Sequence, residues 1–439
     1  MKRDTKTGFL HSSFFKDGLS LISGNVWAQA ITFAAYMLLS RLFSPEDFGL
    51  YNIFYSYIDV LVIVSTCKYE MAVVLADSDR EAMAVSRLAL RLNTIISLVL
   101  LSVLAIVVVG GRIGLVGGGL ASLSVWPLSF IALLIPPMVF FCGTTRVYAA
   151  LFNRMRRFGH IALSEVVGAT SGVVFKILFG LPRLASSALH VVGLPLGTVL
   201  GKVAGNVNYL LKLRKLDLPR DISSSERKAM SRRFRNFPLF TMPKDLINSL
   251  SYNLPFLWLA IYFDKAEVGL FSLALTFTFR PINIFNTAFE KLLYVRVAEK
   301  VRAHKTIKSD IMSFVKYVNI VSLPFFIVLF LFADAIFGFL FGGQWDGCGY
   351  YIRCLLPWVY VMLTSSSLMF ISNIFSKQRT EFMFYIVLLA LRVAAIVVGI
   401  TCYDFRLAIL LFSLSGMAIS LLLIMWYMSL VGKYERQGE

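Results

Sequence analysis

The sequence contains apolar runs without a single charged residue that are each long enough to cross a lipid bilayer as a helix. A helix needs about 20 residues to span the hydrocarbon core, and such runs occupy residues 18–40, 92–111, 113–145, 354–376 and 407–432. Only 15% of the residues are charged and 58% are apolar, whereas a soluble chain carries about a quarter charged residues. The sequence therefore predicts an all-α polytopic membrane protein and excludes a collagen, a coiled coil or a disordered chain.

Polar breaks between apolar stretches divide the chain into twelve predicted spans. They lie at residues 18–40, 47–67, 88–109, 123–150, 160–181, 190–211, 238–262, 267–289, 311–338, 350–373, 381–402 and 405–431. Most of the 43 Lys and Arg residues fall in alternate loops, and the opposite loops hold only Arg41, Arg112, Arg183, Lys265 and Arg406. Since basic loops stay in the cytoplasm, this distribution predicts a multi-pass protein with both termini cytoplasmic.

The longest connection divides the spans into two sets of six. We expect an N-lobe of six spans over residues 1–212, a basic cytoplasmic connector over 213–236 and a C-lobe of six spans over 237–439. Within the connector, Ser225 and Glu226 precede several basic residues, a pattern typical of the start of a short surface helix. Such a basic segment is attracted to anionic lipid.

A shift of 220 residues relates the two predicted lobes. It places Gly49 and Leu50 on Gly269 and Leu270. It also superposes two polar stripes, each with helical spacing on one face: Asn25, Gln29 and Thr32 in the first span and Asp245, Ser249 and Tyr252 in the seventh. The pattern predicts two pseudo-symmetric lobes related by an axis along the membrane normal, with a central cavity between them.

Charged side chains inside predicted spans are candidates for function, because a charge at the bilayer centre costs about 3 kcal/mol and usually faces a partner or water. Five cations lie there: Lys176, Lys202, Arg280, Arg353 and Arg392. Simple snorkelling of a side chain to the interface is an alternative, most of all for Lys176 and Arg353. The excess of cations over acids favours an anionic guest, and guanidinium groups bind phosphate oxygens in pairs.

Two stretches resemble a known family: SRLFSPEDFGLYNIF with TCKYEMAVVLADSDREA, within residues 40–82, and FPLFTMPKDLINSLSYNLPFLWLAIYFDKAEVGLFSLA at residues 237–274. FGGQWDGCGYYIRCLLPW at residues 341–358 and the arginine of LLALRVAAI fit the same pattern. The chain is similar to polysaccharide transporters, the Wzx-type O-antigen and oligosaccharide flippases of the multidrug/oligosaccharidyl-lipid/polysaccharide exporter superfamily. One departure is that the arginine often found at the position of Thr276 stands one turn further on, at Arg280.

The resemblance implies a two-lobed protein of the bacterial inner membrane that moves an undecaprenyl-diphosphate-linked oligosaccharide between leaflets by alternating access. Membrane lipids, and a polysaccharide polymerase and chain-length regulator, would be its partners. Candidate substrate-binding residues are Arg280, Lys202, Arg392, Lys176, Arg353, Asn25, Gln29, Ser249, Tyr252 and Asn283. Since no GxxxxGK[ST] signature occurs, the energy would come from an ion or substrate gradient, with Asp59, Glu165, Asp245 and Glu70 as candidate coupling acids.

Other functions are weighed against the same residues. A multidrug exporter of the same superfamily is the main alternative, although export of organic cations would favour an acidic cavity. A membrane polymerase or ligase would need catalytic residues on a large outside segment, and every predicted outside loop is short. We therefore expect a transporter and no enzyme. The scattered histidines predict no metal site, and no cofactor or nucleic-acid partner is expected.

Overall fold

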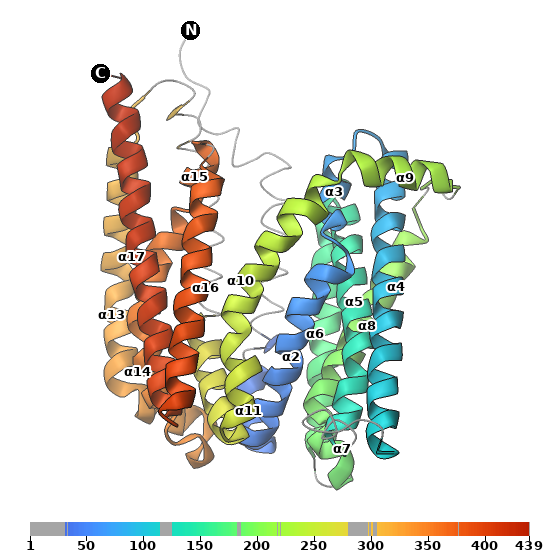
Figure 1. Ribbon diagram of the computed structural model, residues 1–439, viewed down its shortest axis with the longest axis horizontal. Helices are drawn as coiled ribbons and strands as arrows, with labels where there is room; N and C mark the ends of the chain where they lie inside the picture. The colour runs from blue at the N-terminus through green and yellow to red at the C-terminus, as the bar shows by residue number, and fades with distance from the viewer. Residues whose placement is uncertain are drawn as a thin grey trace. The chain divides into compact units, whose positions relative to one another are not determined.

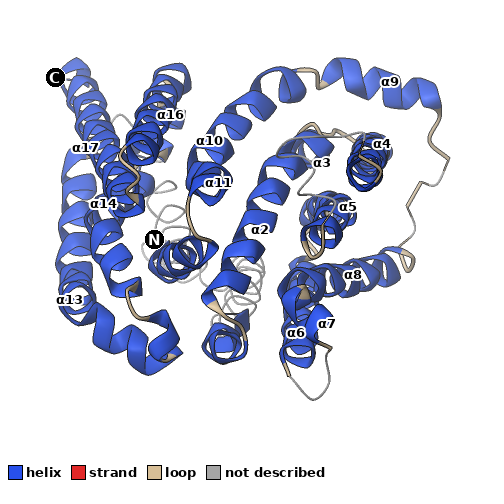
Figure 2. Cartoon of the chain, turned by 60° about the horizontal axis from the view of Figure 1, so that its bottom comes forward, coloured by secondary structure: helices blue, strands red, loops and turns tan. Residues whose placement is uncertain are grey.

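A computed structural model of the chain describes residues 31–32, 34–114, 125–181, 186–216, 218–219, 221–279, 297, 300–301, 305–375 and 377–438. Within these residues the regular structure is helical throughout, as Figures 1 and 2 show. The helices with defined bounds are α2 (Pro45–Ser65), α3 (Tyr69–Leu75), α4 (Asp79–Arg112), α5 (Leu128–Arg154), α6 (Phe158–Gly180), α7 (Ser187–Val191), α8 (Gly193–Leu213), α9 (Ser224–Arg233), α10 (Met242–Leu254), α11 (Ala260–Tyr262), α13 (Lys308–Phe341), α14 (Cys348–Ser367), α15 (Phe370–Ile374), α16 (Gln378–Thr401) and α17 (Phe405–Gly438). Residues 31–42, apart from 33, and residues 265–279 are helical too.

Eight segments in the described part of the chain are long and apolar enough to cross a membrane. In α4 and α13 only 17% of the most apolar 18-residue window is buried inside the protein. Helices that expose so much apolar surface need a non-aqueous environment, so the chain is a multi-pass membrane protein. The all-α class is confirmed. The total of twelve spans stays a prediction, because the first and eighth spans extend into residues outside the described ranges.

Local sequence signals explain where several helices begin and bend. The Ser78 side chain accepts a hydrogen bond from the Glu81 backbone and caps α4. At α9, Ser223 and Glu226 form a reciprocal capping box, in the segment where the sequence predicts a short helix. The span predicted at 238–262 is helical but uneven, since π-helical turns at Phe237–Thr241 and Pro255–Leu259 flank α10. Each turn contains a proline, which cannot donate the regular backbone hydrogen bond.

The chain forms two compact units. The first comprises Met1–Phe43 and Ile53–Leu246, and the second comprises Ser44–Asn52 and Ile247–Glu439. In the first, α3, α4, α5, α6 and α8 share an apolar core in which Ala72, Val85 and Phe152 have no exposed surface. In the second, α13, α15, α16 and α17 pack around a core that includes Leu368, Ile371 and Val431.

A reciprocal helix contact lies within the second unit. Gly49 packs against the carbonyl group of Lys265, and Gly269 packs against the carbonyl group of Pro45. The Asn52 amide also donates to Ser272 Oγ at 2.7 Å, 220 residues away. The 220-residue shift relates Pro45 to Lys265, Gly49 to Gly269 and Asn52 to Ser272. The contacts therefore join equivalent positions of the two segments. Such mutual contact is typical of two segments related by a local twofold axis.

Candidate functional site

Glycines draw α6 and α8 of the first unit into close contact. Gly168 and Gly172 on α6 face Gly197, Gly201 and Gly205 on α8, and Figure 2 shows the two helices lying together. A Cβ atom at Gly201 would lie 2.6 Å from the Gly168 carbonyl oxygen. Small residues at four-residue spacing allow this approach, and the glycines of α8 therefore serve packing.

The same two helices hold a charged pair, one partner on each helix. Lys202 Nζ on α8 lies 3.6 Å from Glu165 Oε2 on α6, and each side chain keeps 31% of its surface exposed. The Tyr209 hydroxyl donates to Glu165 Oε1 at 3.5 Å. This pair is therefore half-buried, so that its charges are desolvated in part and still accessible.

Further polar groups surround this pair within the first unit. The Asn206 amide donates to Thr145 Oγ1 at 2.9 Å, and Ser164 donates to Asn208 at 3.0 Å. We call Glu165, Lys202, Asn206 and Tyr209 the α6–α8 polar cluster. It brings together two of the residues that the sequence selects, namely Lys202 and Glu165. Asp59 lies on α2 and is half-buried.

Arg392 lies in the second unit and is almost fully buried, with 3% of its surface exposed. Its guanidinium carbon stands 4.7 Å from the Trp358 ring centroid and 4.2 Å from that of Phe412. Its Nη1 donates to Ser251 Oγ at 3.0 Å, whereas its Nε has no hydrogen-bond partner among the described residues. The aromatic faces stabilise this cation in place of a carboxylate.

Asp245, predicted as a coupling acid, is engaged in an ion pair in the first unit. Its Oδ2 lies 2.7 Å from Lys68 Nζ. Lys68 has a left-handed backbone with φ of 60° and precedes α3 directly. Cys67 also has a positive φ, so two consecutive residues with the left-handed backbone that is uncommon outside glycine form the turn that carries this lysine.

The remaining predicted residues are distributed over both units. Arg353 Nη1 pairs with Asp334 Oδ2 at 2.8 Å in the second unit, where Arg353 is half-buried and Asp334 is exposed. Lys176 is buried on α6 against Gly197. In the second unit Ser249 is buried, and the Tyr252 ring packs edge-on against Phe279. Glu70, in the first unit, is 6% exposed. Arg280, Asn25, Gln29 and Asn283 lie outside the described residues.

Sequence reasoning did not select several residues that complete these sites. They are Tyr209 at Glu165, Lys68 at Asp245, and Ser251, Trp358 and Phe412 at Arg392. Tyr209 lies on the helix that carries Lys202, two turns further on, a spacing that could have drawn attention to it. No local signal marks the partners of Arg392, which come from three separate helices. In the described ranges no three His, Cys, Asp or Glu side chains gather as a metal site.

A model of the polysaccharide biosynthesis protein family matches residues 38–349, which is more than half of the chain. The chain belongs to this family. The match includes α2 to α13 and thus the α6–α8 polar cluster. Among curated proteins, none has a sequence that matches the chain.

Solved transporter structures share the fold of this family member. An inward-facing multidrug resistance MATE family transporter of the MOP superfamily is 16% identical, with a TM-score of 0.67 over 93% of this chain and 96% of that one. The lipid II flippase MurJ in an inward closed conformation is 11% identical, with a TM-score of 0.68 over 95% and 90% of the two chains. The likeness extends over nearly the full length, so the fold is that of MOP-superfamily transporters, as the sequence resemblance predicts.

Proposed function

We propose that this protein is a flippase that moves an undecaprenyl-diphosphate-linked oligosaccharide across the bacterial inner membrane by alternating access. The match to the polysaccharide biosynthesis protein family over residues 38–349 carries this proposal. The fold shared with the lipid II flippase supports it. The protein acts as a transporter and not as an enzyme, and a polysaccharide polymerase and chain-length regulator would take over its product.

Lys202 is the cation best placed in the described chain to meet a diphosphate. It lies on α8, which packs along the apolar helix α6, keeps part of its surface exposed, and is held 3.6 Å from Glu165. A contact of that length is an ion pair too long for a hydrogen bond, so a phosphate oxygen can compete for the ammonium group. We assign Arg280 and Arg392 as further diphosphate ligands. Asn25, Gln29, Asn283, Ser249 and Tyr252 would serve the sugar, and Lys176 and Arg353 would lie further from it.

The Lys202–Glu165 pair also suggests how substrate and ion are coupled. When the diphosphate binds Lys202, Glu165 loses its counter-charge in a region poor in water. A proton or another cation then compensates the carboxylate, because an unpaired charge there is costly. Substrate binding and cation binding at Glu165 thus favour each other. Asp59 on α2 is the second acid that we assign to this role, and Asp245 and Glu70 are the further candidates.

An export assay tests these assignments in a strain that lacks its own copy of the protein. Lys202→Ala should abolish surface polysaccharide and cause lipid-linked oligosaccharide to accumulate on the cytoplasmic side, whereas Lys202→Arg should retain export. Glu165→Gln should bind substrate but lose the dependence of export on the ion gradient. Arg112→Ala, which removes an exposed cation at the last residue of α4, is the matched control and should export normally. Normal export by Lys202→Ala at normal expression would contradict the site.

Alternating access has its own test in the reciprocal contact of the second unit. Segments 45–52 and 265–272 must separate if this contact closes one side of the transport path. Cysteine pairs that join the two segments should therefore stop export until a reductant is added. Full export with the cross-link demonstrably formed would contradict this role for the contact.

A multidrug exporter is the second candidate, because the MATE transporters share the fold equally well. The phenotype of a deletion strain distinguishes the two functions. Deletion of a flippase leaves drug susceptibility unchanged and causes lipid-linked oligosaccharide to accumulate, whereas deletion of a drug exporter has the reverse effect.

A further inference from the structure

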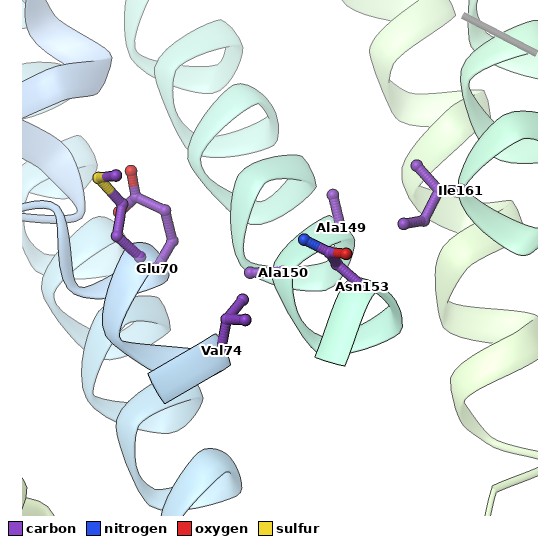
Figure 3. Close-up of a pocket in the computed structure, with 7 residues that line it drawn as sticks. Glu70, Val74, Ala149, Ala150, Asn153 and Ile161 are labelled. Atoms are coloured by element: carbon purple, nitrogen blue, oxygen red, sulfur yellow. The ribbon is translucent and has the colours of Figure 1, made fainter. Parts of the chain in front are cut away.

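A pocket at the basic end of the first unit lies apart from the α6–α8 polar cluster. It has a volume of about 490 Å³ and is lined by Glu70, Met71, Val74, Ala149, Ala150, Asn153 and Ile161. Figure 3 shows Glu70 and Val74 on one side of it and Ala149, Ala150 and Asn153 of α5 on the other. The two alanines leave a recess that larger side chains would fill.

Glu70 places a carboxylate in the wall of this pocket. The side chain is 6% exposed, and its Oε2 has no hydrogen-bond partner among the described residues. A buried carboxylate oxygen without a donor is strongly unfavourable. Because native structures rarely leave such a group unsatisfied, the pocket calls for a ligand that carries an N–H donor and a positive charge.

A second pocket continues the first and is basic. It has a volume of about 450 Å³, shares Val74 and Asn153 with the first, and adds Asp79, Arg154, Arg156 and Phe158 to the lining. Arg154 is already engaged, with Asp79 Oδ1 at 3.3 Å and with the Ala76 carbonyl group. Arg156 is exposed and makes no ion pair with any residue of the described chain. The rim of the combined recess therefore offers a free guanidinium group.

The depth of the recess matches the lipid headgroup region. Arg154 is the last residue of α5, and Phe158 is the first residue of α6. Ala149 and Ala150 lie one turn inside the end of α5, where the apolar part of the span begins. From the helix ends inward, the recess therefore presents first the guanidinium groups of Arg154 and Arg156 and then the Glu70 carboxylate between apolar walls.

We propose that this recess binds a membrane phospholipid with a primary-amine headgroup, phosphatidylethanolamine in chemical class. Its ammonium group would donate to the Glu70 carboxylate, and its phosphate would bind Arg156, which pairs well with phosphate oxygens. One acyl chain would lie along Met71, Val74 and Ile161. A choline headgroup carries the same charge but has no N–H to donate, so the site discriminates between these two lipids.

Native mass spectrometry of the full chain tests the proposal. The protein is purified and equilibrated with equal amounts of dioleoyl phosphatidylethanolamine, phosphatidylcholine and phosphatidylglycerol. The wild type should retain phosphatidylethanolamine over phosphatidylcholine about tenfold, as expected for a hydrogen bond to a charged group. Glu70→Gln should abolish this preference. Arg156→Gln should weaken retention of both lipids, since both carry a phosphate.

Two further variants keep the test decisive. Ala150→Leu fills the recess without changing its charge and should lose the bound phosphatidylethanolamine even if Glu70→Gln fails to fold. Asp221→Asn, which removes an exposed carboxylate outside the recess, should bind as the wild type does. Equal retention of the ethanolamine and choline lipids by the wild type would overturn the proposal. So would an unchanged preference in a folded Glu70→Gln variant, or a preference for phosphatidylglycerol. None of these results depends on transport, so the flippase proposal is tested separately.

Discussion

The glycine contact between α6 and α8 predicts that two identical substitutions, one on each helix, have different consequences. A Cβ atom at Gly201 would lie 2.6 Å from the Gly168 carbonyl oxygen and 2.6 Å from the Gly172 Cα. A Cβ atom at Gly172 would lie 3.5 Å from the Gly197 carbonyl oxygen and 3.5 Å from the Gly201 Cα. The first methyl group overlaps backbone that cannot rotate away, whereas the second makes ordinary van der Waals contact.

These distances set the expected magnitudes. For Gly201→Ala the helices must separate by about 1 Å, which forfeits up to half of the dispersion energy of the contacts between them. Overpacking of this kind costs about 1–3 kcal/mol, against a gain of about 1 kcal/mol when alanine replaces glycine in a helix. Gly172→Ala gains the same helix propensity, and its methyl group makes no steric overlap with α8. We therefore expect Gly172→Ala to be neutral or stabilising and Gly201→Ala to be destabilising.

The assay is the thermal unfolding of both purified variants in one detergent, followed by export in cells. Gly201→Ala should unfold at a lower temperature than the wild type, and Gly172→Ala at the same or a higher one. Gly201 precedes Lys202 directly, so separation of the helices also lengthens the 3.6 Å contact with Glu165 and should reduce export. Equal unfolding temperatures for the two variants, or the reverse order, would refute the reasoning.

The other predictions concern the connector, the topology and the buried arginine. The Glu226 carboxyl has its pKa lowered to about 2, mainly because Arg80 donates to it. Its contribution to holding α9 on α4 is therefore present above its ordinary pKa of about 4.3 and is lost as the pH falls toward 2. The protection of the amides of residues 221–234 against hydrogen exchange, relative to the intrinsic rate at each pH, should fall over that range, and Arg80→Ala should lower it already at pH 7; unchanged protection would count against the pair. Reporters active only in the periplasm should be silent at residue 218 and active at 112, 183 and 265, and the opposite pattern would reverse the topology. Arg392→Met should shift the unfolding free energy by about 2 kcal/mol at most, since a buried ion is often replaced by an apolar side chain without loss, but should abolish export; a folded and active variant would make Arg392 purely structural.

Most of the helical framework could be predicted from the sequence, because hydropathy and charge act over whole segments. The prediction at 160–181 corresponds to α6 at Phe158–Gly180, and that at 381–402 to α16 at Gln378–Thr401. Bilayer thickness fixes the length of such helices. The π-helical turns beside α10 were beyond this reasoning, since the prolines at 238 and 255 allow several backbone solutions.

The site was predictable as a set of residue types and not as a set of contacts. Lys202 and Glu165 stand out as charges in apolar spans, and glycine spacing indicates a close helix approach. Their pairing, however, depends on the rotation and axial offset of α6 against α8, which hydropathy does not determine. Arg392 shows the limit most clearly. Its burial suggests a ligand site, yet Trp358 and Phe412 provide its environment through packing of α14, α16 and α17.

The reciprocal glycine contact has a consequence for the origin of the chain. Gly49 packs against Lys265 while Gly269 packs against Pro45, so the contact is self-complementary: two equivalent segments use the same surface to bind each other. A patch of this kind works between two identical chains before their sequences diverge. An ancestor of half this length, paired as a homodimer, could already have used it. After gene duplication and fusion, neither glycine could enlarge without a clash against the other copy, and drift at this place was restricted while the flanking sequence diverged.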